Sequence, residues 1–222
     1  MRKFNRTNRN ILTKKENNGI IFIPIICKCK KCINVPINPN ERKEEPKRTM
    51  CKKLKELSGM SASKILELYA HDSNYYAVDM QTIMNNIGVP VLLFDFSDLN
   101  QKLSHNIYGA IVLLKDNLAV LVSNKCTKEE QRFILAHELA HCCLHGATLK
   151  KTKIEFASDF DSSDLHEEEA HSFADQLLLP EKDFIDVCKQ FDSKNIDVET
   201  VADIFCVPRS SVIRRIKALG LQ

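Results

Sequence analysis

Residues 127–146 read TKEEQRFILAHELAHCCLHG, and this stretch decides the fold. Thr127 and Glu130 have the spacing of a capping box, in which each side chain bonds to the other residue's backbone N–H at the start of a helix. Apolar residues then recur at helical spacing as far as Gly146, which can end the helix. The stretch therefore predicts one long helix with an apolar face that packs against a sheet.

Two histidines lie one turn apart in the middle of this helix. His137 and His141 are four residues apart, so their side chains share one face and can each direct a nitrogen to one metal ion. Glu138 follows the first histidine and is carried to the side of the metal where a bound water would lie. The pattern His-Glu-x-x-His on a helix is typical of zinc hydrolases, with the glutamate as general base. The alternative is a pair of exposed or core histidines.

A zinc site of this kind needs a third protein ligand. Six residues after His141 stands Ala147, which excludes the zinc peptidases that place a third histidine there. The other solution is a glutamate on the next predicted helix, which begins with Glu167, Glu168 and Glu169. A helix hairpin would bring one of them to the metal, although a glutamate run at a helix start is also typical of a plain acidic surface.

Strands are expected before the histidine helix. Residues 90–96 form an apolar run, and residues 109–114 and 118–123 form two more around a turn, which predicts a hairpin. Short helices precede these strands, with Gly59 between the first two and Gly88 after the third. Residues 147–163 are interpreted as a loop. The predicted fold class is α+β, with a short, mostly antiparallel sheet packed on the histidine helix and the helices that follow.

The tail over residues 197–221 has the outline of a helix-turn-helix, with a tight turn at residues 206–208. Its second helix carries Arg209, Arg214, Arg215 and Lys217 on or near it. These cations suit phosphate contacts, which is the DNA-binding interpretation. The interpretation that we favour is a helix pair that closes the domain. In that case, replacing Arg214 and Arg215 is expected to leave stability nearly unchanged.

Charge divides the chain into two parts. Residues 1–53 carry 15 Lys and Arg against 4 Glu, whereas residues 54–222 carry 17 Lys and Arg against 25 Asp and Glu. We interpret residues 1–48 as a basic, flexible N-terminal extension that is dispensable for catalysis, and residues 49–222 as one domain that includes the helical tail. Cys27, Cys29 and Cys32 of the extension are either unpaired reduced cysteines or, less favoured, ligands of a second metal.

Apolar runs are too short for a membrane span of ~20 residues. The best run, residues 20–26, is broken by Pro24 and lacks the features of a signal peptide. The nine cysteines are an odd number scattered along the chain, which is unlike a secreted disulfide framework. The sequence therefore favours a cytoplasmic protein with no membrane partner, and no feature of it specifies an oligomeric state.

Residues 132–141 (RFILAHELAH) and 167–180 (EEEAHSFADQLLLP) resemble the ImmA/IrrE family of bacterial and phage metallopeptidases. The second motif of that family reads Glu-x-x-Ala-Asn/Asp-x-Phe-Ala, followed by Leu-Leu-x-Pro. The resemblance, which covers about residues 60–221, implies that Glu167 is the third zinc ligand beside His137 and His141. It also implies a small zincin-like domain whose zinc metallo-endopeptidase activity cleaves a partner helix-turn-helix repressor in a mobile element or a stress response.

One position departs from the family pattern. His171 stands where the family has Asn or Asp, and it could hydrogen-bond near the ligands, compete as a ligand or lie partly exposed. His145 is expected to support the site from outside the metal or to lie at the surface. Tyr108, His166 and His171 are the candidates for stabilising the oxyanion. The alternative function is a catalytically inactive regulator that keeps the zincin scaffold and binds DNA or a partner protein.

Overall fold

The structure, a computed structural model, describes residues 51–70, 76–97, 107–114, 117–146, 154–158, 165–191 and 196–221. The predicted extension and its cysteines Cys27, Cys29 and Cys32 lie outside these residues. The helices are α1 (Lys52–Leu57), α2 (Ala62–Tyr69), α3 (Met80–Ile87), α5 (Lys128–Leu144), α6 (Leu165–Leu178), α7 (Glu181–Cys188), α8 (Val198–Phe205) and α9 (Arg209–Leu219). The strands are β1 (Val91–Phe94), β2 (Ile107–Leu114), β3 (Asn117–Ser123) and β4 (Ile154–Ser158). The predicted α+β class is confirmed.

The strands form one sheet in the order β1-β3-β2-β4. β2 and β3 pair as the predicted antiparallel hairpin, β4 pairs antiparallel with β2, and β1 pairs parallel with β3. The prediction that residues 147–163 form a loop is wrong at residues 154–158, which are β4. This strand was not predicted because polar residues flank it in the sequence. In addition, its hydrogen-bonding partner β2 lies about 45 residues earlier, and local sequence patterning does not report pairing between distant segments.

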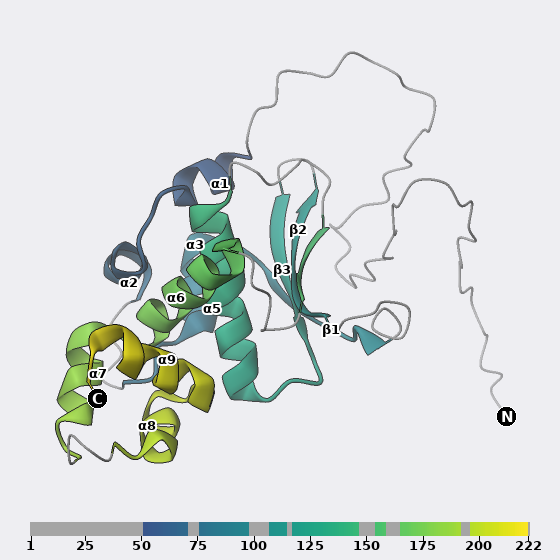
Figure 1. Ribbon diagram of the computed structural model, residues 1–222. Coiled ribbons are helices and arrows are strands. Elements are labelled where there is room, and N and C mark those ends of the chain that lie inside the picture. Colours follow the sequence, from purple (N-terminus) through teal and green to yellow (C-terminus); the bar gives the residue numbers. More distant parts are fainter. Residues whose placement is uncertain are drawn as a thin grey trace, which may run out of the picture. The chain divides into compact units, whose positions relative to one another are not determined.

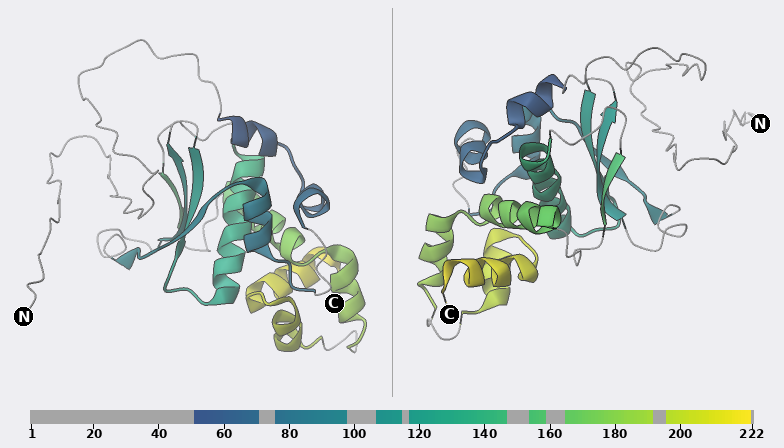
Figure 2. Two further views of the ribbon diagram at one scale, coloured as in Figure 1. Left: turned by 180° about the vertical axis from the view of Figure 1, so that it is seen from behind. Right: turned by 45° about the horizontal axis from the view of Figure 1, so that its top comes forward.

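The helices cover one face of the sheet, as Figures 1 and 2 show. Side chains alternate between the two faces along the central hairpin. Ile111 and Val120 belong to the main core beneath the helices, whereas Ala110 and Leu121 belong to a second buried cluster. α5 lies between the sheet and α6 (Figure 1). The histidine helix is therefore held on both sides by packed layers.

The start of α5 is built as the sequence predicts. The Thr127 side chain accepts a hydrogen bond from the Glu130 backbone, and the Glu130 carboxylate accepts one from the Thr127 backbone. One turn later, the guanidinium of Arg132 donates to the carbonyl of Val78 at 2.6 Å and to the carbonyls of Phe205 and Cys206. Arg132 thus joins α5 to the segment before α3 and to the end of α8.

The C-terminal helices pack against α6. Arg214 of α9 binds the buried Asp175 of α6 through two hydrogen bonds, and Arg215 donates to the carbonyl of Leu179 at 3.1 Å. Both arginines have internal partners, so we now expect their replacement to lower the stability of the protein, contrary to the expectation from the sequence. Arg209 pairs instead with Glu199 at 2.6 Å.

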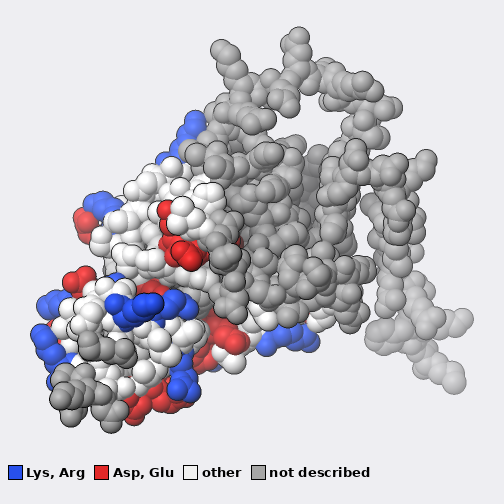
Figure 3. Space-filling model, viewed as in Figure 1, with Lys and Arg blue, Asp and Glu red and all other residues white. Residues whose placement is uncertain are grey.

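Acidic and basic side chains are interspersed where α7, α8 and α9 lie, at the lower left of Figure 3. Together with the internal bonds of Arg214 and Arg215, this mixture favours the packing interpretation of the tail. Within the described ranges, none of the helices has the length and apolar character that a bilayer span needs.

Candidate metal centre

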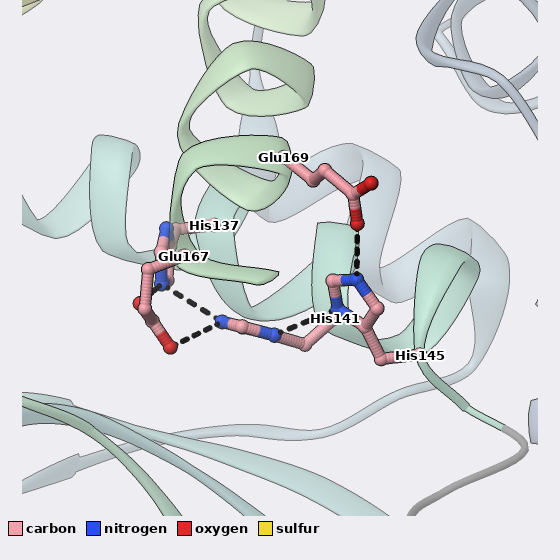
Figure 4. Close-up of polar contacts among 5 residues, drawn as sticks. All are labelled: His137, His141, His145, Glu167 and Glu169. Atoms are coloured by element: carbon pink, nitrogen blue, oxygen red, sulfur yellow. Dashed lines mark hydrogen bonds and ion pairs between the residues drawn. The ribbon is translucent and has the colours of Figure 1, made fainter. Parts of the chain in front are cut away.

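Three side chains predicted as metal ligands converge between α5 and α6. The Nε2 atoms of His137 and His141 are 3.0 Å apart. The carboxylate of Glu167, near the start of α6, lies with Oε2 3.1 Å from Nε2 of His137 and Oε1 3.4 Å from Nε2 of His141. Figure 4 shows the three side chains pointing toward one another. Of the three glutamates at the start of α6, Glu167 is the one with this position.

The spacing of these donor atoms fits a zinc ion. Tetrahedral bonds of about 2.0–2.1 Å separate neighbouring ligand atoms by about 3.3 Å. The observed separations of 3.0–3.4 Å match that value. The donor set of two imidazole nitrogens and one carboxylate is also the set that catalytic zinc sites use, with a fourth position left for water or substrate.

Burial and hydrogen bonding set the charges at this centre. Burial lowers the pKa of His137, although Glu167 opposes that shift, so the imidazole stays neutral and can offer a lone pair. Burial would raise the pKa of Glu167, but hydrogen bonds from His137 and His141 hold it well below its ordinary range. The carboxylate is therefore ionised at neutral pH, as a metal ligand must be.

His171 lies beside this cluster. A donor atom of His171 falls within 4.8 Å of donor atoms of His137 and Glu167, so His171 is also placed where it could bind a metal. Burial and the neighbouring His137 and Arg214 lower the pKa of His171 to about 4. His171 is 9% exposed, so the structure does not favour the alternative in which it lies partly exposed on the helix. The contacts of 3.0 and 3.4 Å that Nε2 of His141 makes with His137 and Glu167 favour His141 as the ligand.

Glu138, the predicted general base, is buried against strand β2. A Cβ atom at Gly109 would lie 2.5 Å from Oε1 of Glu138 and 2.5 Å from Cγ2 of Ile134. Only glycine leaves room for the carboxylate at this point of the strand. Sequence reasoning missed Gly109, although a glycine inside an apolar strand is a known sign of a close approach.

The remaining predicted residues lie around this centre in different ways. Tyr108 is on β2, where it packs partly buried against the main core. His166 is exposed on α6, with its ring centroid 4.5 Å from that of His145.

His145 contacts two of the residues around the cluster. One of its ring nitrogens lies 3.1 Å from Nδ1 of His141, and the other lies 3.0 Å from Oε2 of Glu169. The contact between His145 and Glu169 was not predicted, because it depends on how α6 packs against α5. Cys142 and Cys143 are buried in the main core.

A pocket of about 310 Å³ opens beside His171. It is lined by Glu168, His171, Ser172 and Asp175 of α6 and by Arg214, Arg215 and Ala218 of α9. The guanidinium of Arg214 also stacks on the ring of Phe133, 5.2 Å from its centroid. The C-terminal helix therefore contributes to a polar pocket that shares His171 with the metal cluster.

Comparisons with known proteins identify the family of this chain. The profile of the Peptidase M78 family, described as an IrrE N-terminal-like domain, matches residues 84–217. The "uncharacterized immunity region protein 2" of Bacillus phage phi105 is 29% identical over 107 residues, which are 48% of this chain and 64% of that protein. The match thus spans less than two thirds of the phage protein.

Among solved structures, a Mycobacterium tuberculosis transcriptional regulator aligns with a TM-score of 0.47 and 16% identity, over 70% of this chain and 44% of that chain. The family profile covers more than half of the sequence, and its matched region includes α5, α6 and the C-terminal helices. The chain has the peptidase-type fold of this family and belongs to the ImmA/IrrE family, Peptidase M78.

Proposed function

We propose that the protein is a zinc-dependent metallo-endopeptidase in which His137, His141 and Glu167 hold the zinc ion. The observation that carries this proposal is the convergence of their donor atoms, with separations of 3.0–3.4 Å. Family membership supports a metallopeptidase-like or regulatory role. A zinc ion held there would supply a Lewis acid and would lower the pKa of a water molecule toward ~7.

Glu138 is the general base of the proposed reaction. It follows a ligand histidine on α5, and Gly109 leaves space for its carboxylate beside the strand. Glu138 takes the proton of the attacking water and passes it to the leaving amine. His171 is a candidate for binding the developing oxyanion, because it lies next to His137 and Glu167.

The pocket between α6 and α9 is the proposed place for a substrate side chain. It reaches His171, and its volume of about 310 Å³ can accommodate one large side chain. Arg214 lines the pocket, and its Nε and Nη2 atoms bind Asp175, which fixes the orientation of the guanidinium. Filling the pocket by Ala218→Trp is expected to reduce cleavage while zinc content stays the same. Lys217→Trp, one residue away on the exposed surface, is the matched control.

The proposed substrate is a partner helix-turn-helix repressor in the cytoplasm, cleaved to relieve repression. The similarity to an immunity region protein of a phage supports a regulatory setting of this kind. The second candidate function is a regulator that binds DNA or a protein without turnover. The outline of α8 and α9 is the observation in its favour, and the internal bonds of Arg214 and Arg215 weigh against DNA binding.

The decisive experiment combines metal content with cleavage. The full chain should contain about one zinc by elemental analysis, and His137→Ala, His141→Ala and Glu167→Ala should each lose most of it. Glu168→Ala, at an exposed neighbour of Glu167, should retain zinc. Glu138→Gln should keep zinc but fail to cleave the purified repressor encoded beside it, as read by mass spectrometry. Full zinc in Glu167→Ala, or unchanged cleavage by Glu138→Gln, would contradict the proposal.

A further inference from the structure

A chain of three polar groups leads away from the proposed metal site. His145 follows the last residue of α5 and lies one turn after His141, with its side chain 9% exposed. Its Nδ1 atom is 3.1 Å from Nδ1 of His141, on the side of that ring away from Glu167. Its Nε2 atom is 3.0 Å from Oε2 of Glu169 on α6. Figure 4 shows the chain running from His141 through His145 to Glu169.

The hydrogen positions in this chain follow from the role of His141. A histidine that binds a metal through Nε2 has its lone pair there, so its proton is on Nδ1. The 3.1 Å contact then requires Nδ1 of His145 to accept that proton in a hydrogen bond. The proton of neutral His145 is therefore on Nε2, which donates to the carboxylate of Glu169. Each donor therefore meets an acceptor in this series of hydrogen bonds from His141 to Glu169.

We propose that His145 and Glu169 are positioning residues that hold His141 in the tautomer and ring orientation required for zinc binding. The inference rests on the proposed function, because it acts through a ligand histidine. A hydrogen bond to the second nitrogen of a ligand imidazole fixes its orientation and increases its basicity. Here a second histidine transmits the effect of the carboxylate. Both nitrogens of His145 are engaged in this chain, so His145 is not itself a ligand.

A purely structural role is the competing explanation, because the contact between His145 and Glu169 also joins α5 to α6. The two roles predict different outcomes. A structural tie affects the stability of the zinc-free protein and leaves the zinc affinity of the folded protein unchanged. A positioning role weakens zinc affinity, and a side chain that restores the same hydrogen bonds restores that affinity.

The test measures zinc affinity of the folded full chain by competition with a chromophoric chelator. His145→Leu and Glu169→Ala are each expected to weaken zinc binding 10–100-fold. His145→Gln is expected to recover most of the affinity, because its amide oxygen can accept from His141 and its NH₂ group can donate to Glu169. Glu168→Ala, the neighbouring residue on α6, is the matched control and should bind zinc within about twofold of the wild type.

Further readouts separate the possible results. Glu169 is 48% exposed, so Glu169→Ala is expected to fold even if His145→Leu does not; circular dichroism checks both. Cobalt(II) in place of zinc should give an altered visible spectrum in His145→Leu at unchanged stoichiometry. Unchanged affinity in both variants, with zinc still lost in His137→Ala, would overturn the inference and leave the metal site standing. No zinc binding by the wild type would instead overturn the proposed function.

Discussion

The guanidinium of Arg214 forms a two-point contact with the carboxylate of Asp175, with Nε 2.6 Å from Oδ2 and Nη2 2.9 Å from Oδ1. Asp175 is on α6, two turns after Glu167, and Arg214 is on α9. The Asp175 side chain is 5% exposed, so its charge has little access to water. The pair therefore connects the C-terminal helix to the helix that carries the proposed third ligand.

Arg214→Ala should destabilise the protein by about 2 kcal/mol or more, because it leaves the buried carboxylate of Asp175 without its counter-charge. Urea unfolding of the zinc-free chain measures this loss. Arg209→Ala is the control, since Arg209 is on the same helix in a largely exposed pair with Glu199. That change should cost less than about 1 kcal/mol. Equal effects of the two substitutions would contradict the assignment of a structural role to Arg214.

Gly109→Ala should abolish most cleavage while zinc binding is retained. The added methyl group would lie 2.5 Å from Oε1 of Glu138, so the carboxylate must move from its place. The double variant Gly109→Ala/Glu138→Gln tests the mechanism of this loss. If Gly109 acts through Glu138, the double variant should be no less active than Glu138→Gln alone. A further large loss in the double variant would show that the strand itself has been disturbed.

Arg132→Lys should lower the free energy of unfolding by about 2 kcal/mol or more. The planar guanidinium donates to backbone carbonyls of Val78, Phe205 and Cys206, and a single ammonium group does not reproduce this fork. Lys128→Ala, at the exposed start of the same helix, should change stability by no more than about 0.5 kcal/mol. Chemical unfolding of zinc-free protein compares the two, and a neutral Arg132→Lys would contradict the anchoring role.

The zinc-free protein should lose stability as the pH falls from about 6.5 toward 4. Burial and neighbouring charges lower the pKa of His171 from its ordinary value of 6.5 to about 4, so the unfolded chain binds this proton first. Stability therefore rises with pH across this window, because the unfolded state holds more protons than the folded state. His137, whose pKa burial also lowers, acts in the same direction.

Urea midpoints at pH 5 and pH 7 measure this dependence. His171→Asn, which introduces one of the residues typical of the family at that position, should reduce the difference between the two midpoints. An undiminished difference in this variant would mean that other groups carry the pH dependence.

Features within one segment could be predicted from the sequence. The capping box, the length of α5 and the pairing of β2 with β3 depend on residues close in the chain, and the structure agrees with each prediction. The shared face of His137 and His141 follows from helical geometry alone, because residues four apart lie nearly one above the other. The placement of the two histidines on one face of α5, with Glu138 beside them, could therefore be predicted before the fold was known.

Contacts between side chains of different segments could be identified only from the tertiary structure. Successive residues of a helix point about 100° apart, so the rotation of α6 against α5 decides that Glu167 meets His137 and His141 while Glu169 meets His145. From spacing alone the three glutamates were equivalent, and only the family resemblance distinguished Glu167.

The same reason explains β4, the inward direction of Arg214 and the closeness of Gly109 to Glu138. Each of these depends on the packing of elements that are distant in the chain. By itself the sequence determined which helix carries two of the proposed metal ligands and which strands form the hairpin. The packing of α6, α9 and β2 around that helix decided which side chains complete and support the site, because contacts between elements are set by their relative positions and not by local periodicity.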